Sequence, residues 1–346
     1  MGIAVWRGYT KKAAPAPAVV EEKDVNFYDD YDGTIVASYS AADFANLSAL
    51  PANPSHEGLV AEGWNWTLAN AKTYVATYGK LNISQMYHTA SGKTEYDVEI
   101  NEATGMTATI NNAEEKDWGD GTTDTNTTHT YTAAGNYTIK MGGATLPSIQ
   151  NSKKVRAVRI ASSVTSIDSS AFFACYTLQY VTISSSVTNI GVAAFYRCYS
   201  LRGMTIPSGV TSLLDSIFST CYSLKYITIP NSITYMETNV FYSCYTLKNI
   251  TFPNGVPNIG AAVLRNCYSL QSVTIPSSVT SIGNNAFANS IWLTILIVFA
   301  VTPPTLGTGV FPTSVQKIYI PNGTLAAYQA DASWSALGVP FVELPA

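Results

Sequence analysis

From about residue 150 onward, apolar and polar residues follow a pattern that recurs at a fixed distance. Each repeat contains a stretch of the form apolar-x-x-apolar-x-apolar, and these stretches read LQYVTI, LRGMTI, LKYITI, LKNITF and LQSVTI. A second apolar set follows in each repeat, as in Val187, Ile190, Ala194 and Phe195. Alternate residues of a strand point to one face, so each repeat is expected to form a strand and to bury two sides. One repeat cannot cover that surface alone, whereas stacked repeats form a continuous core.

The cysteines give the length of the repeat. All five are spaced 23 residues apart: Cys175, Cys198, Cys221, Cys244 and Cys267. A fixed period between 20 and 50 residues indicates a solenoid. The period extends back to Val155 and forward to Leu293, and a last strand from Val315 is offset by 22 residues. We therefore predict about eight coils and, from the strand spacing, a solenoid roughly 35–40 Å long.

The pattern CYSLxxhTIPxSVTxIGxxAF, in which h is apolar, resembles the leucine-rich repeats of BspA-like, or Treponema-pallidum-type, proteins. Residues 144–300 carry the repeats, and residues 301–346 resemble the C-terminal cap common in such proteins. The resemblance implies a role in bacterial surface adhesion and partner binding, in a family not known for catalysis. One feature departs from the family: the residue after Cys is usually small and polar, but here it is Tyr in all five repeats.

Residues 93–143 are predicted to form a small all-β module. The motifs DWGDGT, HTY and GNYTI, which begin at Asp117, His129 and Gly135, resemble the signature of PKD-like β-sandwich domains. Such a domain implies a spacer or a protein-contact module. In local terms, Asp and Gly favour tight turns. Residues 142–150 are the expected boundary with the repeats.

Residues 25–92 are predicted to form a small α+β anchoring domain. Asp32-Gly33 lies between two apolar stretches and predicts a hairpin. Thr67 is expected to cap a helix that ends near Gly79. The stretches LNISQMYHT and KTEYDVEI are expected to form a second hairpin. The fold class is therefore mainly β: a leucine-rich-repeat solenoid preceded by a β-sandwich-like module and an α+β domain.

Two N-terminal segments suggest attachment to something larger. Residues 1–24 contain the run AAPAPA and are predicted to be a flexible or docking arm. The stretch FANLSALPANPSHEGLVAEGWNWTL resembles N-terminal segments of repeat proteins in gut-phage genomes. Residues 1–20 lack the apolar core of a secretory signal. We therefore expect either that the export signal is missing from this sequence or that the protein leaves its cell by another route, as a virion component does.

Charge narrows the range of partners. Only 12% of the residues are charged, the net charge is −4, and no basic run occurs. Nucleic-acid binding needs clustered Lys and Arg, so we expect no nucleic-acid partner. No stretch offers the ~20 apolar residues that a membrane span requires, so no membrane insertion is expected.

The residues suited to catalysis or metal binding do not form a recognisable motif. His56, His88 and His129 are far apart, and no nucleophile elbow, phosphate loop, HExxH or zinc CxxC motif occurs. Asp29, Asp30 and Asp32 hint at calcium but lack the remaining EF-hand ligands, which favours turn chemistry. Asp215 and Glu237 lie 22 residues apart and could be neighbours, as a glycosidase pair requires, but surface charges are the simpler interpretation. We predict no catalytic residue, metal or cofactor.

The cysteines are expected to form one inward column. Neighbouring coils would bring their Cα atoms within disulfide distance, so bridges are one alternative. Buried cysteine more often behaves as a small apolar residue, and we favour reduced thiols in the core.

The candidate binding residues are aromatic and basic. One tyrosine per coil should form a ladder along one edge, and this set comprises Tyr176, Tyr199, Tyr222, Tyr245 and Tyr268. Outward strand positions beside it vary between repeats, and this set comprises Tyr180, Tyr226, Arg202, Lys225 and Lys248. Tyrosine offers a large contact area with few rotatable bonds and a polar tip. The alternative is that the tyrosines only stack on one another and stabilise the solenoid.

These observations predict a non-enzymatic, surface-exposed adhesion or receptor-binding protein. The expected ligand is a bacterial surface glycan or protein, and low charge with many aromatic and hydroxyl groups suits a carbohydrate. The favoured hypothesis is a phage virion appendage, on the tail or capsid, whose N-terminal region contacts other virion proteins. The alternatives are a bacterial cell-surface adhesin and a purely structural virion decoration protein.

Overall fold

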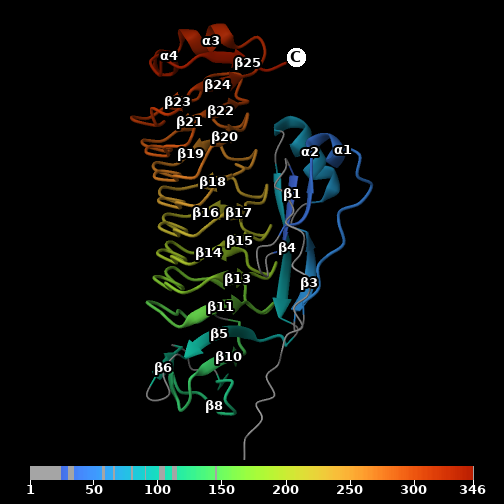
Figure 1. Cartoon of the computed structure of the whole chain (residues 1–346), viewed down its shortest axis with the longest axis vertical. Coiled ribbons are helices and arrows are strands. Elements are labelled where there is room, and N and C mark those ends of the chain that lie inside the picture. Colours follow the sequence, from blue (N-terminus) through green and yellow to red (C-terminus); the bar gives the residue numbers. More distant parts are fainter. Residues whose placement is uncertain are drawn as a thin grey trace, which may run out of the picture.

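The computed structural model describes residues 25–29, 35–56, 59–64, 67–78, 81–89, 91–100, 106–110, 115–144 and 146–345. The predicted arm (1–24), the Asp32-Gly33 turn and two of the three aspartates considered for calcium, Asp30 and Asp32, lie outside these residues. The main body is a solenoid of stacked coils, and a smaller unit lies alongside it (Figure 1).

The prediction of a solenoid with about eight coils is confirmed. Its principal parallel strands are β11 (Val155–Arg159), β13 (Tyr180–Thr182), β15 (Gly203–Thr205), β17 (Tyr226–Thr228), β20 (Ser272–Ile275), β22 (Ile295–Val298) and β24 (Lys317–Ile320). The coil between β17 and β20 takes part through a single bridge from Thr251 to Thr274. Gly203 lies opposite Tyr226, a shift of one 23-residue repeat. Ile295 lies opposite Lys317, which confirms the predicted offset of 22 residues.

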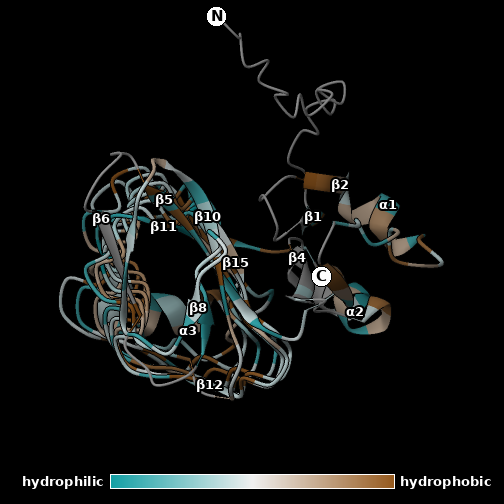
Figure 2. Ribbon diagram, turned by 90° about the horizontal axis from the view of Figure 1, so that it is seen from below, coloured by the Kyte–Doolittle hydropathy of each residue, from teal (hydrophilic) through white to brown (hydrophobic). Residues whose placement is uncertain are grey.

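A second series of short strands forms another side of each coil. They are β12 (Ser166–Ile167), β14 (Asn189–Ile190), β16 (Ser212–Leu213), β18 (Tyr235–Met236), β19 (Asn258–Ile259), β21 (Ser281–Ile282) and β23 (Thr305–Leu306). Each contributes one apolar residue to the interior, as Ile190 and Leu213 do. Viewed along the solenoid, the coils form a closed ring around this interior (Figure 2). Each coil therefore buries two sides, as the sequence pattern predicts.

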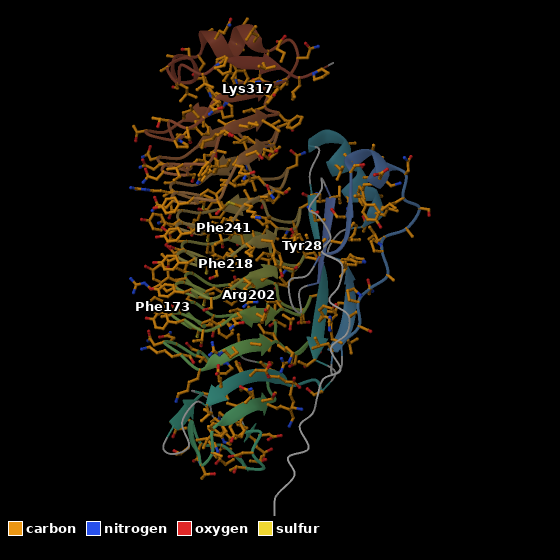
Figure 3. The ribbon with its side chains drawn as sticks, in the orientation of Figure 1. Tyr28, Phe173, Arg202, Phe218, Phe241 and Lys317 are labelled. Carbon is orange, nitrogen blue, oxygen red and sulfur yellow. The ribbon has the colours of Figure 1, made fainter. Side chains whose placement is uncertain are left out.

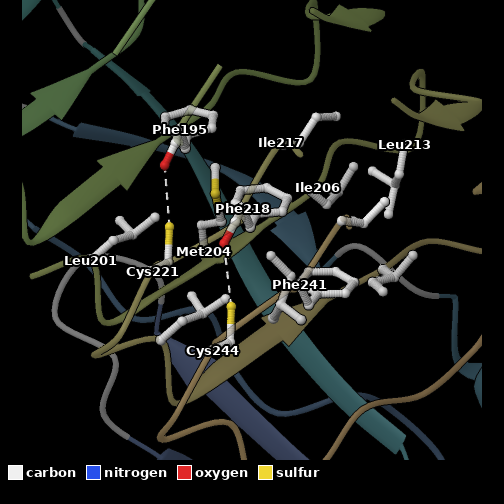
Figure 4. Packing of buried hydrophobic residues seen from close by; sticks show 14 of the residues in the cluster. Phe195, Leu201, Met204, Ile206, Leu213, Ile217, Phe218, Cys221, Phe241 and Cys244 are labelled. Atoms are coloured by element: carbon white, nitrogen blue, oxygen red, sulfur yellow. Dashed lines mark hydrogen bonds between the residues drawn. The ribbon is translucent and has the colours of Figure 1, made fainter. Parts of the chain in front are cut away.

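The cysteine column is part of the core. All five thiols are free and buried, which confirms the favoured interpretation. Each Sγ donates a hydrogen bond to the backbone carbonyl 26 residues earlier, as Cys221 does to Phe195 and Cys244 to Phe218 (Figure 4). Ser290 occupies the cysteine position of the next coil and its hydroxyl donates to Leu264 in the same way. Cysteine thus satisfies a buried carbonyl while it packs as an apolar residue.

Two residues in each complete coil adopt the left-handed backbone conformation. One series comprises Asn151, Ala174, Arg197, Thr220, Ser243, Asn266 and Asn289, and the other comprises Ser170, Ala193, Ser216, Asn239, Ala262 and Asn285. These residues connect the coils: the N–H of Thr220 donates to Tyr242, and that of Ala193 to Asp215. None is glycine, although glycine is the residue that adopts this conformation at least cost.

A β-module covers the first coil. It contains β5 (Thr94–Ile100), β10 (Gly135–Met141), β7 (Lys116–Asp117) and β8 (Thr123–Asp124) in one sheet, and β6 (Met106–Thr109) with β9 (Thr128–Tyr131) in another. β5 pairs antiparallel with β11, so one eight-stranded sheet runs from the module into the solenoid. The two parts also share one hydrophobic core. The module therefore continues directly into the repeats.

Ion pairs reinforce this junction. Arg159 of the first coil contacts both Asp97 and Glu95 of β5, at 2.6 and 3.0 Å. Arg156 pairs with Glu99. Arg159 is largely buried, and a buried charge is costly unless it is paired. The hydrogen-bonded carboxylates of Asp97 and Glu95 compensate the charge of Arg159.

The N-terminal unit is a four-stranded sheet with two helices. The strands are β1 (Val25–Asp29), β2 (Ile35–Tyr39), β3 (Leu59–Trp64) and β4 (Leu81–Thr89), in the order β2-β1-β4-β3, and the helices are α1 (Ala41–Ala45) and α2 (Leu68–Tyr78). β1 and β2 form the predicted antiparallel hairpin. The Thr67 hydroxyl accepts from the N–H of Asn70 at the start of α2, as a cap does.

The predicted hairpin between LNISQMYHT and KTEYDVEI is wrong. β4 pairs with β1 and β3 in the N-terminal unit, whereas β5 pairs with β10 and β11. The turn after residue 90 therefore leads from one sheet to another. Alternation and turn chemistry predict two strands and a reversal, but they carry no information about long-range partners.

The C-terminal residues close the other end of the solenoid. Helices α3 (Leu325–Ala330) and α4 (Ala332–Ser335) place Tyr328 and Trp334 on the core, and both side chains are fully buried. The Tyr328 hydroxyl donates to Ala300, and the Trp334 Nε1–H donates to Pro304. β25 (Phe341–Glu343) then pairs with β24 as a last strand.

Candidate binding surface on the solenoid

The tyrosine ladder (Tyr176, Tyr199, Tyr222, Tyr245 and Tyr268) runs along one edge of the solenoid. Ring centroids of successive tyrosines lie 5.0, 4.6, 4.6 and 4.8 Å apart. This distance matches the spacing of neighbouring strands, so the repeat length alone brings the rings together. All but the first pair are nearly parallel, with interplanar angles of 8–14°.

Stacking decides which part of each ring can meet a partner. An inner ring such as that of Tyr222 has a neighbour on both faces, so solvent reaches its edge and hydroxyl but not its π faces. The ladder is half-buried, and exposure rises to 37% at Tyr268. The ladder therefore offers a row of phenol hydroxyls rather than a row of flat platforms.

Basic residues accompany the ladder. Arg202, Lys225 and Lys248 each follow a ladder tyrosine by three residues and are exposed. The N–H of Lys225 donates to Arg202 and that of Arg202 to Gln179, so these positions lie in register on successive coils. The Arg202 guanidinium donates to the Tyr180 hydroxyl at 2.7 Å and lies over its ring. Tyr180, which is half-buried, thus positions Arg202.

Arg197 adds a further cation beside the ladder. It precedes Cys198, and its guanidinium lies over the ring of Tyr196. A hydrogen bond to Tyr196 and the nearby phenols of Tyr199 and Tyr176 raise the pKa of Arg197. The two acidic residues of the central coils, Asp215 and Glu237, lie instead just after the short strands β16 and β18. The Glu237 carboxylate accepts a hydrogen bond from the backbone N–H of Asp215. The ladder edge therefore carries positive charge.

The principal strand face is covered, contrary to the expectation that its outward residues meet solvent. β4 of the N-terminal unit lies across β13, β15 and β17 (Figures 1 and 2). Tyr226 is only 6% exposed, because its ring stacks on that of Tyr28 at 4.4 Å. Tyr28 lies between the two parts (Figure 3). Tyr226 is therefore an internal contact in this structure, and the sequence pattern could not show what covers it.

The residues around Tyr226 leave room for its contact with Tyr28. A Cβ at Gly203 would lie 2.2 Å from the Tyr226 ring, so only glycine leaves room for the ring to lie across the next coil. The outward threonines Thr182, Thr205 and Thr228 are buried.

Polar and apolar contacts also attach the N-terminal unit. The Glu62 carboxylate accepts hydrogen bonds from the Ser184 hydroxyl and the Ser185 N–H, at 2.9 and 2.7 Å. Phe299 from the far end of the solenoid packs against the apolar core of the N-terminal unit. The unit therefore contacts both the early and the late coils.

An exposed apolar pair ends the ladder, and the sequence interpretation did not identify it. Ile291 follows Tyr268 by one repeat and is 58% exposed, and Trp292 beside it is 64% exposed. The position of Trp292 is Ser or Thr in the five preceding coils. That substitution is the signal in the sequence, since Ser200 and Thr246 use their hydroxyls to bond the backbone of neighbouring coils.

The PKD-like motifs form a local hydrogen-bonded turn. The indole of Trp118 donates to Asp124, and Tyr131 donates to the Trp118 carbonyl. His129 contacts Asp120 at 2.7 Å and stacks on Trp118. Partial burial favours the neutral form of Asp120, but its hydrogen bonds with His129 and Thr122 hold its pKa below the usual value. This arrangement explains the Asp-Gly signature as turn chemistry, and the PKD-like relationship itself stays a prediction.

Metal-binding side chains are not clustered in the described part of the chain, where no group of three or more His, Cys, Asp or Glu side chains is placed to hold a metal ion. His56 packs edge-on against Tyr87, far along the chain from His129. No helix in the described part of the chain is long and apolar enough to cross a membrane.

The repeats match a known family. The family described as "BspA type Leucine rich repeat region" matches in six copies, over residues 148–270 and 236–330. No curated protein matches the chain.

Several solved structures are similar to this chain. The leucine-rich repeat protein of Treponema pallidum is 27% identical, with a TM-score of 0.38 over 52% of this chain and 79% of that one. A leucine-rich repeat protein from Bacteroides ovatus is 19% identical, with a TM-score of 0.33 over 55% and 73%. The pneumococcal vaccine antigen PcpA is 17% identical, with a TM-score of 0.34 over 54% and 67%. Since the matched repeats span residues 148–330 of 346, the chain belongs to the BspA-type leucine-rich repeat family.

Proposed function

We propose that this protein is a non-enzymatic binding protein displayed on a surface, and that the tyrosine ladder with its basic neighbours contacts an extended glycan or protein. The observation that carries the proposal is the placement of the ladder. It lies on an edge of the solenoid, whereas the principal strand face is occupied by the N-terminal unit. The repeat region therefore keeps a continuous aromatic surface available to a partner.

The geometry of the ladder favours a partner that accepts hydrogen bonds at regular intervals. Phenol hydroxyls donate and accept, and their rings recur every 4.6–5.0 Å. An extended polysaccharide or a peptide strand presents polar groups along its length and can meet several tyrosines at once. Arg202, Lys225 and Lys248 favour a partner with carboxylate or other anionic groups.

The end of the ladder supplies a different kind of contact. Trp292 is exposed and lies beside the end of the tyrosine ladder, next to Ile291 in the coil that follows Tyr268. A free indole face can stack on a sugar ring or pack on an apolar side chain. The ladder edge and the terminal indole together form one surface. This surface contains Tyr, Trp and Arg, the residues that are enriched in the binding surfaces of proteins.

Display on a surface is supported by membership of a family implicated in bacterial surface adhesion. The finer hypothesis of a phage tail or capsid appendage is supported by the resemblance of residues 44–68 to gut-phage repeat proteins. In that hypothesis residues 1–24 contact other virion proteins. Mass spectrometry of purified virions distinguishes this from a bacterial cell-surface adhesin.

The test is binding of the fluorescently labelled full chain to a panel of gut bacteria by flow cytometry. A first variant changes all five ladder tyrosines to Phe, which keeps the rings and removes the hydroxyls. A second variant changes Arg202, Lys225 and Lys248 to Ala. The matched control is Tyr235→Phe, because Tyr235 is 50% exposed and lies in a short strand away from the ladder.

We expect strain-selective binding by the native chain and by Tyr235→Phe, and at least a tenfold loss in both ladder variants. Circular dichroism and thermal unfolding must show that the variants are folded. Unchanged binding by both variants would place the contact elsewhere and leave the ladder as a stabilising stack. Absence of binding to every strain would favour a structural decoration role.

A further inference from the structure

A cavity of about 310 Å³ lies at the junction of the β-module and the first coil. Its walls come from β5, from β10 and from residues 149–155, which lead into β11. β5 and β11 pair with a register shift between Val155 and Ala157. The sheet changes from antiparallel to parallel pairing at β11, and the cavity lies beside this change.

The cavity combines apolar walls with a basic mouth. Its apolar lining consists of Val98, Ile110, Ile139, Ile149 and Val155. Residues 150–154 are polar and include both Lys153 and Lys154. Of the lining residues only Gln150, Asn151 and Lys153 are exposed, which places the mouth there. No carboxylate occurs among the described residues that line the cavity.

Tyr96 gives the cavity a polar atom at depth. Its side chain lines the cavity and is fully buried, and its hydroxyl has no hydrogen-bond partner among the described residues. Buried tyrosine hydroxyls usually have a partner. Burial raises the pKa of Tyr96 far above its ordinary value, so the phenol stays protonated and can donate.

The size of the cavity limits the ligand. Small-molecule sites begin near 300 Å³, and a cavity of about 150 Å³ holds one benzene ring. A volume of about 310 Å³ therefore suits a molecule of about twelve non-hydrogen atoms. The walls require that most of these atoms be carbon.

We propose that this cavity binds a hydrophobic monocarboxylate that carries an oxygen atom at its far end. The carboxylate lies at the mouth beside Lys153 and Lys154, the hydrocarbon part contacts the aliphatic walls, and the distal hydroxyl or carbonyl oxygen accepts a hydrogen bond from Tyr96. The site is separate from the tyrosine ladder and does not depend on the function proposed for it.

The experiment is isothermal titration calorimetry of the full chain with four probes of one chain length: 8-hydroxyoctanoate, octanoate, octan-1-ol and octylamine. We expect octanoate to bind at least tenfold more tightly than octylamine, because the mouth is basic. We expect 8-hydroxyoctanoate to bind at least as tightly as octanoate, although a hydroxyl in an apolar cavity normally weakens binding.

Two variants assign the effects to residues. The double variant Lys153→Ala/Lys154→Ala should remove the preference for octanoate over octylamine, and circular dichroism should show that this variant is folded. Tyr96→Phe should make 8-hydroxyoctanoate bind at least fivefold more weakly than octanoate. The control Tyr137→Phe removes a hydroxyl that bonds to Ala133 on the module surface and should change neither preference.

Equal affinity for all four probes, or no binding at millimolar concentration, would overturn the proposal. So would a preference for octanoate that survives in the double lysine variant. A crystal structure in which ordered water fills the cavity and bonds to Tyr96 in the presence of saturating 8-hydroxyoctanoate would identify a hydrated packing defect instead.

Discussion

Replacing Thr220 by Asn should stabilise the solenoid. Thr220 has a φ of 60° and belongs to a series in which other coils have Asn, at positions 151, 266 and 289. A left-handed conformation costs an ordinary L-residue about 1–2 kcal/mol, whereas Asn adopts it more readily. A β-branched residue is an outlier in this region. The position therefore stores strain that a single substitution can relieve.

The expected gain is smaller than the strain itself. The Thr220 hydroxyl donates to the Ser219 carbonyl, and loss of such a bond costs about 0.5–1.5 kcal/mol. The backbone contact to Tyr242 does not depend on the side chain. We expect a net stabilisation of about 0.5–1 kcal/mol, which for a body of this size corresponds to a rise in Tm of about 1–4 °C.

Thermal unfolding by differential scanning calorimetry measures this shift. Thr220→Gly should stabilise less than Thr220→Asn, because glycine gains about 0.5–1 kcal/mol of freedom in the unfolded chain. Thr211→Asn is the matched control, since Thr211 is exposed and is not among the left-handed residues. Equal shifts for Thr211→Asn and Thr220→Asn, or a lower Tm for Thr220→Asn, would refute the argument from backbone strain.

Three further perturbations test other parts of the structure. Burial raises the pKa of Cys175 to about 12 and raises that of the other four cysteines; iodoacetamide at pH 8 should therefore label none of them in the native chain and all five in urea, and labelling of the native chain, read by mass spectrometry, would contradict the core placement. A double-mutant cycle with Tyr28→Ala and Tyr226→Ala should give a coupling of about 0.5–1.5 kcal/mol in urea unfolding; zero coupling would mean that the N-terminal unit does not dock as described. Trp334→Ala should cost about 3–5 kcal/mol, because it removes a fully buried indole and its hydrogen bond to Pro304; a loss below about 1 kcal/mol would show that the C-terminal helices do not close the core.

The repeat could be predicted because its information is local and periodic. One 23-residue coil specifies which residues face inward, and the next coil repeats the specification, so strand positions, the cysteine column and the offset before Val315 all follow from the sequence. The rings of the ladder stack because the coil spacing places each ring 4.6–5.0 Å from the next.

Contacts between unlike parts could not be predicted in this way. Nothing in the pattern of Tyr226 shows that Tyr28, almost 200 residues earlier, covers it. The same limitation explains the incorrect hairpin: β4 and β5 have ordinary strand patterns, and only packing assigns them to separate sheets. The left-handed residues are not predictable in this way either, because Ala, Arg and Thr at such positions give no turn signal.

The unlike ends of the solenoid determine how it can grow. Each inner coil pairs with a neighbour on both sides, and two bare ends of that kind could join head to tail into an open filament. Here one end is joined to β5, which runs in the opposite direction, and the other carries α3, α4 and the three-residue strand β25. Neither end offers the edge of a standard coil, so the repeats form a particle of defined length. Length can change only by insertion or deletion of whole 23-residue units in the middle, and each such event lengthens or shortens the row of tyrosines by one without altering either end.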